Sequence, residues 1–344
     1  MTIRGAWGTR TGWIRRALTN GRFWWGPADP KDGILVGGTP DDTLANSGRF
    51  FFDPNTGILA AGRGAQSTSA TGSSIALGPA TASGNNAIAI ATGSGGARAS
   101  ATGSGALAIQ TGNTNGTTSS GSGSVAIGQG ATASGVGAFA IGNLAAASGI
   151  GAFSFGTEGD SNNTAAGDKS FVFGGSCQTN ATFGFAHGRY GNANRYGQDT
   201  RGFSIFGNVG DAQLSQLGFR GSTTDATPTE LTLFGQAGQY LTVGNNRTLS
   251  FTANVAAHRT DVTGTVAAWP SISGAITRDA GGSCRIVGAV TGAGTTAICD
   301  AGAATWNVTL TADAANNRLA ITVTGEAAKT IRWVVSVEAV EVSG

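Results

Sequence analysis

The chain has 344 residues, of which 58 are glycine and only 12% are charged, and its formal net charge is +2. Because no dense run of lysine or arginine is present, this composition argues against a nucleic-acid-binding protein. No stretch approaches the roughly 18 consecutive apolar residues of a membrane span, so membrane insertion is not expected either.

Residues 1–64 form the first predicted region. They hold four of the seven tryptophans and several arginines, and Pro27, Pro30, Pro40 and Pro54 exclude long regular elements. Such a composition is typical of a docking surface; a small β-cap that closes the first coil of the following repeats is the alternative. The basic start lacks the apolar core of a signal peptide, so secretion by a standard signal is not expected.

Residues 65–210 repeat a phrase of about fourteen residues, as in SVAIGQGATASGVGAFAIG, and each copy ends on an anchor position. Successive anchors lie 13 to 19 residues apart. A basic period with tolerated insertions is typical of a solenoid whose insertions are loops. The anchors are Gly78, Gly128, Gly142, Gly156, Gly174, Gly188 and Gly207, with Ala91 and Gln110 in weaker copies.

Each repeat contains two strand-like halves. In GAFAIG, Phe139 and Ile141 share one face, and the alanines before and between them share the other. ATASG, residues 131–135, alternates in the same way, and glycines stand at the corners where positive φ is needed. So many glycines, without an apolar stripe of helical period, argue against helix. We therefore predict an all-β fold: a parallel β-solenoid, or β-roll, with two short strands per coil.

The bulky apolar residues of the repeats cannot fit inside such a coil, because its inner wall is mostly alanine and glycine. They would form an apolar stripe along one side of the ribbon, which is unusual on the surface of a monomer. Three coils around a threefold axis would bury it, so we expect a homotrimer. The predicted trimer core consists of Ile127, Phe139, Ile141, Phe153, Phe155, Phe171, Phe173 and Phe185.

SVAIGQGATASGVGAFAIG resembles the head repeat of the trimeric autotransporter adhesins, over roughly residues 65–210. The resemblance implies a trimeric left-handed parallel β-roll with its bulky residues turned toward a shared core. The signal peptide and coiled-coil stalk of that family have no counterpart that we recognise here. Rolls of the same kind recur in bacteriophage fibres, and that is the context we expect.

Residues 211–344 alternate apolar and polar residues between Gly and Asn turns, in around ten segments. This pattern predicts a separate β-sandwich or jelly-roll domain at the C-terminus. The stretches AAHRTDVTGTVAAW and GEAAKTIRWVVSVEAVEV resemble the C-terminal domains of phage and prophage tail-fibre proteins. The resemblance implies that this domain is the receptor-binding tip.

The stretch HGRYGNANRYGQDTRG, residues 187–202, concentrates tyrosine and arginine in an interval that the anchors set at nineteen residues. Tyr190, Arg195 and Tyr196 are candidate ligand-binding residues, because these residue types anchor ligands by stacking and forked hydrogen bonds. The favoured alternative is a junction with the last domain, strengthened by inter-chain pairs between arginine and Asp199.

Trp269 and Trp306 are further ligand candidates as sugar platforms, although their alternating strand context favours core packing. The cysteines Cys177, Cys284 and Cys299 show neither a disulfide framework nor zinc-ligand spacing. We expect buried, reduced thiols, with a Cys284–Cys299 pair across a hairpin as the alternative.

His187 is the candidate metal ligand. FAHG places it where other copies carry Ile141, Phe155 or Phe173, so threefold symmetry would bring three imidazoles to the axis. Three imidazoles can ligate a metal ion, whereas ordered water or bonds to backbone carbonyls would satisfy them otherwise. No cofactor is expected.

Catalysis is not expected. Between Ala65 and Thr157 there is no Asp, Glu, His or Lys, so this section cannot supply the two carboxylates of a glycan hydrolase. Glu158, Asp160 and Asp168 lie in an insertion that is more typical of a polar loop than of a catalytic pair. No nucleophile, phosphate-binding or dinucleotide motif occurs in a suitable context.

The sequence therefore predicts a structural and adhesive fibre of a tailed bacteriophage, assembled in the host cytoplasm and located in the virion. Residues 1–64 would attach it to baseplate, tail or collar proteins, and residues 211–344 would meet a host cell-surface glycan or protein. A bacterial surface adhesin is the first alternative, and a glycan-depolymerising tailspike the second.

Overall fold

A computed structural model describes residues 34–36, 49–53, 58–62, 65–67, 73–92, 98–112, 114–156, 163–294 and 298–344. The chain divides into two compact units, Met1–Ala165 and Ala166–Gly344. Strands dominate both units, and the one helical element among these residues is a short 3-10 turn at Ala301–Ala303. About nine coils of parallel β-solenoid, shared between the two units and followed by antiparallel sheets, confirm the predicted fold class.

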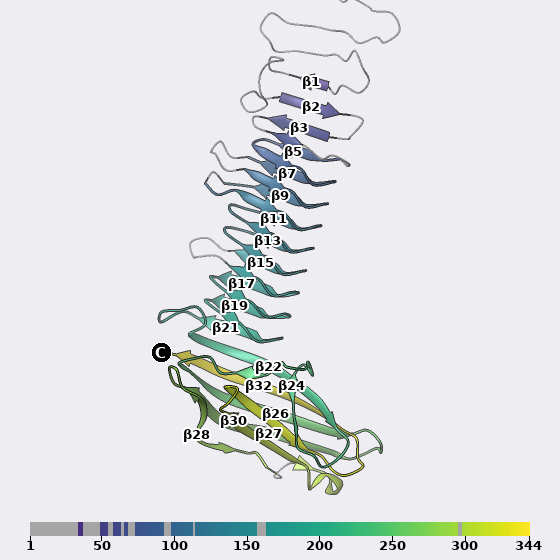
Figure 1. Cartoon of the computed structure of the whole chain (residues 1–344), viewed down its shortest axis with the longest axis vertical. Coiled ribbons are helices and arrows are strands. Elements are labelled where there is room, and N and C mark those ends of the chain that lie inside the picture. Colours follow the sequence, from purple (N-terminus) through teal and green to yellow (C-terminus); the bar gives the residue numbers. More distant parts are fainter. Residues whose placement is uncertain are drawn as a thin grey trace, which may run out of the picture. The chain divides into compact units, whose positions relative to one another are not determined.

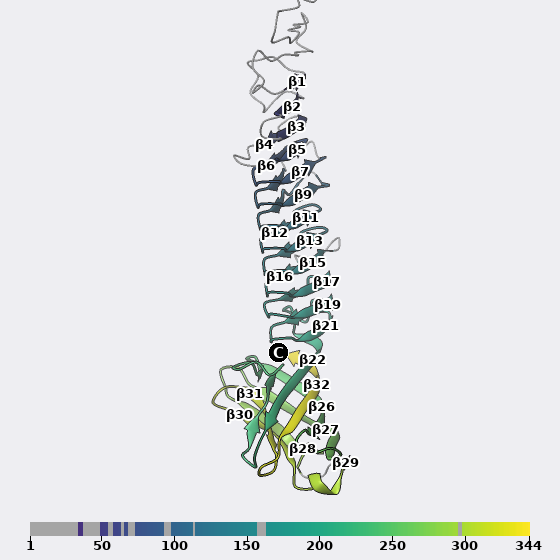
Figure 2. The same cartoon turned by 90° about the vertical axis from the view of Figure 1, so that its right-hand side faces the viewer.

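The first unit stacks short parallel strands into two sheets, and successive strands alternate between them (Figures 1 and 2). Sheet A consists of β3 (Ile58–Gly62), β5 (Ile75–Leu77), β7 (Ile88–Ala91), β9 (Leu107–Gln110), β11 (Val125–Ile127), β13 (Phe139–Ile141) and β15 (Phe153–Gly156). Sheet B consists of β4 (Gln66–Ser67), β6 (Ala80–Ala82), β8 (Ala99–Ala101), β10 (Thr117–Ser119), β12 (Thr132–Ala133), β14 (Ala146–Ala147) and β16 (Thr164–Ala165).

The strand register follows the predicted repeat. Ile127 lies opposite Ile141, and Ile141 lies opposite Phe155, at the fourteen-residue interval. Ile109 also lies opposite Ile127 although eighteen residues separate them, because the extra residues leave the coil between strands. Insertions thus change the loops and leave the stack intact, as the spacing of the anchors predicted.

The interior of each coil is narrow. Ala126 and Ala140 of sheet A face Ala133 and Ala147 of sheet B across this interior, and all four are 0% exposed. Serine replaces alanine in the wall at position 154, where its hydroxyl donates to the carbonyl oxygen of Asn163 at 3.2 Å. A few polar side chains, such as Gln110 and Thr117, are also fully buried, whereas the large apolar side chains point outward.

The start of the first unit contains a short antiparallel meander. β1 (Ile34–Val36) pairs with β2 (Arg49–Asp53), β2 pairs with β3, and β3 then pairs in parallel with β5. These strands lead directly into the solenoid, as the β-cap alternative requires. The four N-terminal tryptophans lie outside the described residues, so the attachment role of residues 1–64 stays a prediction.

The second unit begins with further coils. Their strands are β17 (Phe171–Gly175), β19 (Phe185–Arg189) and β21 (Asp199–Phe203), with β18 (Gln178–Thr179) and β20 (Asn192–Ala193) on the other side. Gly188 lies opposite Gly202, so the last interval has fourteen residues and ends at Gly202. The prediction of an anchor at Gly207 and a nineteen-residue interval was wrong.

The chain has already left the solenoid when it reaches SIFG. The buried Asp211 carboxylate accepts hydrogen bonds from the backbone N–H groups of Phe206, Gly207 and Asn208, at 2.7–3.1 Å. This side chain holds the segment as a tight connecting loop. SIFG therefore shares the residue types of the repeat phrase but does not form a strand of the solenoid.

The terminal domain packs two antiparallel sheets around one core. The large sheet contains β22 (Ala212–Thr223), β24 (Thr232–Leu233), β26 (Arg247–Arg259), β27 (Val266–Arg278), β28 (Cys284–Thr291), β29 (Ile298–Cys299) and β32 (Ile331–Ser343). The small sheet contains β23 (Thr229–Glu230), β25 (Leu241–Thr242), β30 (Asn307–Asp313) and β31 (Arg318–Thr324). Because β22 also pairs with β21, the large sheet continues from the last coil without a linker.

We predict that Gly142→Ala destabilises the solenoid more than Gly137→Ala. Both glycines have positive φ, +110° and +63°, so both substitutions strain the backbone by about 1–2 kcal/mol. At Gly142 a Cβ would also lie 2.1 Å from the carbonyl oxygen of Gly156, whereas at Gly137 no atom lies within 4 Å. Thermal unfolding followed by circular dichroism should give the lower midpoint for Gly142→Ala. Equal midpoints would contradict this close contact between coils.

Candidate functional site

The outer face of sheet A in the first unit carries two stacked rows of large apolar side chains, here called the apolar face. Their register is continuous from β5 to β15, and each residue is half-buried. Neighbours within a row cover one another: the Phe139 and Phe153 rings stack with centroids 4.8 Å apart. The rows are Ile75, Ile88, Leu107, Val125, Phe139 and Phe153, and Leu77, Ile90, Ile109, Ile127, Ile141 and Phe155.

The prediction that the bulky residues share one outer face is confirmed for Ile127, Phe139, Ile141, Phe153 and Phe155. The earlier half of the apolar face was missed: most of its Ile and Leu residues stand in the weaker copies of the repeat, and Ile75 and Leu77 stand in the first copy, IALG. The same alternation in IAL, AIAIA and ALAIQ was the signal that could have found it.

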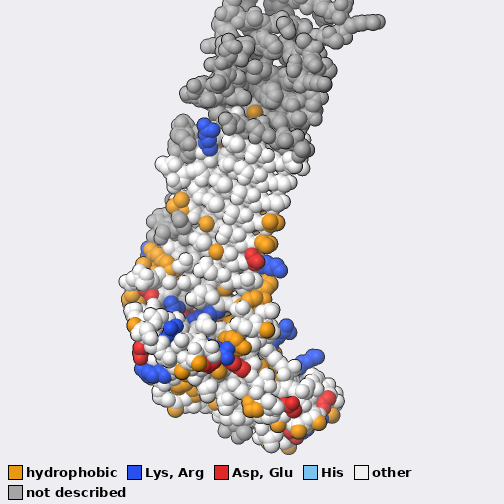
Figure 3. All heavy atoms as spheres, in the orientation of Figure 1, with side chains coloured by type: hydrophobic (Ala, Val, Ile, Leu, Met, Phe, Trp, Pro, Cys, Tyr) orange, Lys and Arg blue, Asp and Glu red, His pale blue; other side chains and the backbone are white. Residues whose placement is uncertain are grey.

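The outer side of sheet B has a different character. Its outward side chains are mostly hydroxyl-bearing, at Thr81, Ser100, Thr118, Thr132 and Thr164. Figure 3 shows a face of the solenoid that carries few apolar and few charged side chains. Such a face stays hydrated in water, so the apolar face is the surface of the first unit that favours association.

In the second unit the corresponding rows change from aromatic to charged. Phe173 lies opposite His187 and His187 opposite Arg201, while Phe171 lies opposite Phe185 and Phe185 opposite Asp199. This confirms the predicted register of His187. Its ring stacks on Phe185 with centroids 4.9 Å apart, and its Nδ1 lies 3.4 Å from Asp199 Oδ1.

The metal site predicted at His187 needs three copies of the chain. Within a single copy, no group of three potential His, Cys, Asp or Glu ligands occurs among the described residues. The threefold site therefore stays a prediction. Phe173, the residue opposite, is 55% exposed, so this part of the row faces outward in one chain.

Arg195, a candidate ligand-binding residue, is buried at the junction with the terminal domain. Its Nη1 and Nη2 donate to Glu341 Oε1 and Oε2 at 2.7 and 3.1 Å, and its Nε donates to the carbonyl oxygen of Thr242 at 2.8 Å. Arg247 Nη1 donates to the same carboxylate at 2.8 Å. The guanidinium is thus committed within the chain: Arg195 does lie at the predicted junction, but its partner is Glu341 of the same chain, and the predicted inter-chain pairs with Asp199 stay a prediction.

Tyr196 also belongs to the junction. Its ring packs edge-on against Phe183 and Phe234, with centroids 5.6 and 6.1 Å away. Tyr190 differs, because its φ is +62° and the guanidinium of Arg189 lies over its ring at 5.2 Å. Tyr190 is half-buried at the surface and remains a candidate for ligand contact.

Trp269 and Trp306 are both 0% exposed. Each packs against Trp333 with centroids 5.8 Å apart, and the Trp269 indole donates to the carbonyl oxygen of Gly294 at 3.0 Å. They form the centre of the core between the two sheets. They are therefore not sugar platforms, and the core-packing alternative is correct.

The three cysteines lie among the described residues and none forms a disulfide. Burial raises the pKa of the Cys177 and Cys284 thiols, as expected for reduced structural cysteines. Cys299 is exposed, contrary to the expectation of burial. Cys284 lies opposite Arg278 and Cys299 opposite Ala267, near different ends of β27, so the two do not face each other.

Of the three acidic residues considered for catalysis, Glu158 and Asp160 lie outside the described residues. Asp168 is exposed in a turn, and its carbonyl oxygen accepts a hydrogen bond from the backbone N–H of Phe183 at 3.0 Å. A carboxylate pair in this insertion therefore stays untested. The expectation that the chain is not an enzyme likewise stays a prediction.

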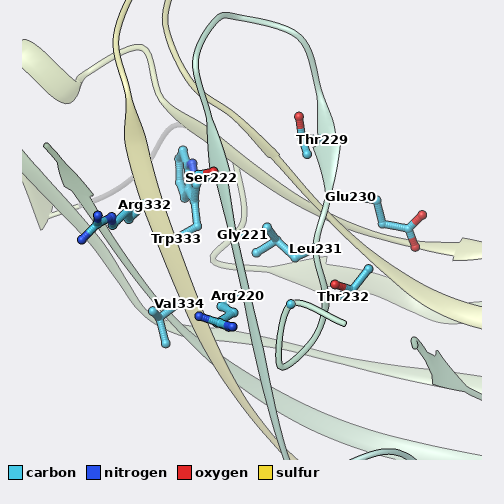
Figure 4. A pocket seen from close by; sticks show the side chains of 11 residues that line it. Arg220, Gly221, Ser222, Thr229, Glu230, Leu231, Thr232, Arg332, Trp333 and Val334 are labelled. Carbon is cyan, nitrogen blue, oxygen red and sulfur yellow. The ribbon is translucent and has the colours of Figure 1, made fainter. Parts of the chain in front are cut away.

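A groove of about 440 Å³ opens on the terminal domain, lined by β22, by the segment from Thr229 to Gly235, and by β32 (Figure 4). Arg220, Ser222 and Arg332 are exposed along it, with the hydroxyls of Thr229 and Thr232 nearby. Sequence reasoning missed the groove because residues of β32 join two segments about a hundred residues earlier, and no motif is shared.

The charges of the groove are partly held in place. Arg220 Nε donates to the carbonyl oxygen of Phe234 at 2.7 Å, and Glu230 Oε2 accepts from Arg318 at 2.8 Å. Burial raises the pKa of Glu230, although the Arg318 charge opposes it. The remaining donors of Arg220 and the exposed Arg332, together with hydroxyls, suit a polar or anionic ligand such as a glycan.

The chain matches no protein-family model and no curated protein sequence. Nowhere in the described part of the chain does a helix have the length and hydropathy needed to cross a membrane. The apolar face, the junction and the groove are therefore the features that carry the functional inference.

The Glu341 carboxylate is 1% exposed. Burial alone would raise its pKa, but the charge and hydrogen bonds of Arg195, a hydrogen bond from Ser215 and the charge of Arg247 lower the pKa to about 2. Because the folded pKa lies below the ordinary value of 4.5, the ionised carboxylate stabilises the fold above about pH 4.5. That contribution is lost as the pH falls toward 2.

We predict that Glu341→Gln lowers the free energy of unfolding of the terminal domain by about 3–5 kcal/mol at neutral pH, because it leaves buried guanidiniums without their counter-charge. The wild type should lose stability between about pH 4.5 and 2, and the variant should lose less over that window. Urea unfolding at a series of pH values measures both effects. Glu338→Gln, an exposed neighbour on β32, is the control. A pH dependence unchanged by Glu341→Gln would refute the assignment.

Proposed function

We propose that three parallel copies of this chain form the adhesive fibre of a tailed bacteriophage, and that the terminal domain contacts the host cell surface. The observation that supports assembly is the apolar face. Twelve large apolar side chains lie in two unbroken rows on the outside of sheet A. Covering apolar surface contributes about 25 cal/mol per Å², and a continuous patch of this kind is unusual on a monomer.

The order of residues within the rows supports a parallel arrangement. Ile and Leu occupy the β5, β7 and β9 end, and Phe occupies most positions at β13 and β15. In parallel copies each coil meets its equivalent, so small side chains meet small ones and rings meet rings at every level. Antiparallel copies would place the Ile and Leu end of one face against the Phe end of the other.

The resemblance of the repeats to trimeric adhesin heads supports three copies, and the resemblance of the terminal stretches to tail-fibre domains supports the virion. We propose that residues 1–64 attach the fibre to baseplate, tail or collar proteins, and that the host ligand is a cell-surface glycan or protein. The fibre would be assembled in the host cytoplasm. The proposed role is adhesion without catalysis, and the groove of the terminal domain is the surface best suited to a polar ligand.

Light scattering of the full chain should give about three times the chain mass of 34.0 kDa. Phe139→Asp should abolish assembly, because it places an unpaired charge in the covered face at a cost of several kcal/mol. Thr132→Asp, on the outer side of sheet B, is the matched control and should leave the mass unchanged. A wild-type mass of 34.0 kDa at micromolar concentration would disprove the trimer.

Fluorescently labelled full-length protein should bind a subset of a panel of bacterial strains, measured by flow cytometry. On a strain that is bound, Arg332→Ala should weaken binding by about tenfold or more, because linked sites amplify a loss at each one. Arg285→Ala removes an equally exposed arginine outside the groove and should have little effect. If both variants bind alike, the groove is not the contact; if no strain is bound, adhesion itself is in doubt.

A further inference from the structure

The last coil interrupts the apolar rows with charge. In the row that runs through Phe173, the next positions are His187 and Arg201; in the other row, Phe171 and Phe185 lead to Asp199. Both charged residues lie on β21 and point to the same side as the phenylalanines before them. Charge at the end of an otherwise apolar surface is costly to cover unless it is paired.

A hollow of about 230 Å³ lies over this position, lined by His187, Asp199, Arg201, Leu214 and Gln216. Asp199 is 44% exposed at its side chain, and Arg201 is exposed. The Nδ1 atom of His187 is buried and forms no hydrogen bond, although Asp199 Oδ1 lies 3.4 Å away. The hollow is therefore polar and incompletely satisfied within one chain.

Arg201 has no ion-pair partner within its own chain among the described residues. On β19 its cross-strand neighbour is His187, and on β22 it is the apolar Leu214. The nearest anion on its own strand is Asp199, two residues away and so about 6.6 Å along the strand. The other acidic side chain on this face, Glu338 of β32, is hydrogen-bonded by Gln216.

We propose that Arg201 of each chain forms an ion pair with Asp199 of a second copy, so that three such pairs close a ring where the rows of the second unit end on β21. This inference rests on the proposed trimer. The negative Asp199 and the positive Arg201 lie on the same face of β21, two residues apart. The threefold rotation of the proposed trimer can therefore place each arginine against the carboxylate of the next copy. A threefold ring closes in this way with every charge used once.

The ring has a function that apolar contacts lack. Rows of similar side chains in a regular stack tolerate a shift of one coil with little loss, because each coil resembles the next. Charges that occur on β21 and not on the preceding strands of either row make such a shift costly, since each guanidinium would then face an aromatic ring. The ring thus sets the axial register of the three chains where the terminal domains begin.

Charge exchange in the full-length protein tests the ring. Asp199→Arg or Arg201→Asp alone should raise the concentration of half-dissociation by about tenfold or more, because like charges then meet in the interface. The double variant Asp199→Arg/Arg201→Asp restores opposite charges and should return to near the wild-type value. Arg285→Asp, an exposed reversal elsewhere in the second unit, is the control and should have no effect.

A covalent test separates the ring from the trimer. Asp199→Cys/Arg201→Cys in a Cys299→Ser background should give a covalent trimer on a denaturing gel after treatment with a short bis-maleimide crosslinker, because an arginine–aspartate pair holds its Cα atoms farther apart than a disulfide spans. Either single cysteine should give at most a dimer. A double charge variant as weak as the single ones, together with no covalent trimer, would overturn the ring while a wild-type trimer stands. A monomeric wild type would instead overturn the proposed assembly.

Discussion

The width of the coil is the constraint on which the rest of the solenoid depends. The interior is walled mostly by alanines such as Ala126 and Ala140 and admits only occasional larger side chains, such as Val172 and Gln110, so the Phe, Ile and Leu side chains of the repeat stand outside. A single coil therefore buries little apolar area. This burial offsets only a small part of the conformational entropy that the coil loses on folding. The apolar face is the outcome: the side chains that would normally stabilise a core are displayed in rows on the surface. In the proposed trimer, association of copies would supply the burial that the coil itself lacks.

Much of this arrangement could be predicted because it depends on local periodicity. Alternation at Phe139 and Ile141 identifies a strand and its two faces, and the anchor spacing identifies the stack. The error at Gly207 shows the limit of that approach. SIFG has the residue types of an anchor phrase, but the Asp211 carboxylate organises it as a loop, and no repeat pattern reports a capping side chain five residues downstream.

The junction and the groove could not be derived from the sequence for a related reason. Arg195 meets Glu341 across 146 residues, and the groove combines residues near positions 220, 230 and 332. Their proximity follows from the order of strands in the antiparallel sheets, which alternation alone does not determine. The same contacts show that the stability of the terminal domain depends on residues that precede position 211. A fragment that starts at residue 211 would keep Glu341 buried and lose Arg195, so the last coil is part of the folding unit.

The direct pairing of β21 with β22 also has an entropic consequence. Backbone hydrogen bonds join the last coil to the large sheet, and the buried Arg195 side chain fastens the same two parts, so the terminal domain has no swivel at its base. A tip on a flexible tether loses orientational freedom whenever it engages a surface, and that loss is subtracted from the affinity. A tip built into the sheet has already given up this freedom during folding. In the proposed trimer, three such domains would keep nearly all of their contact energy at each encounter with a surface, even when each individual contact is weak.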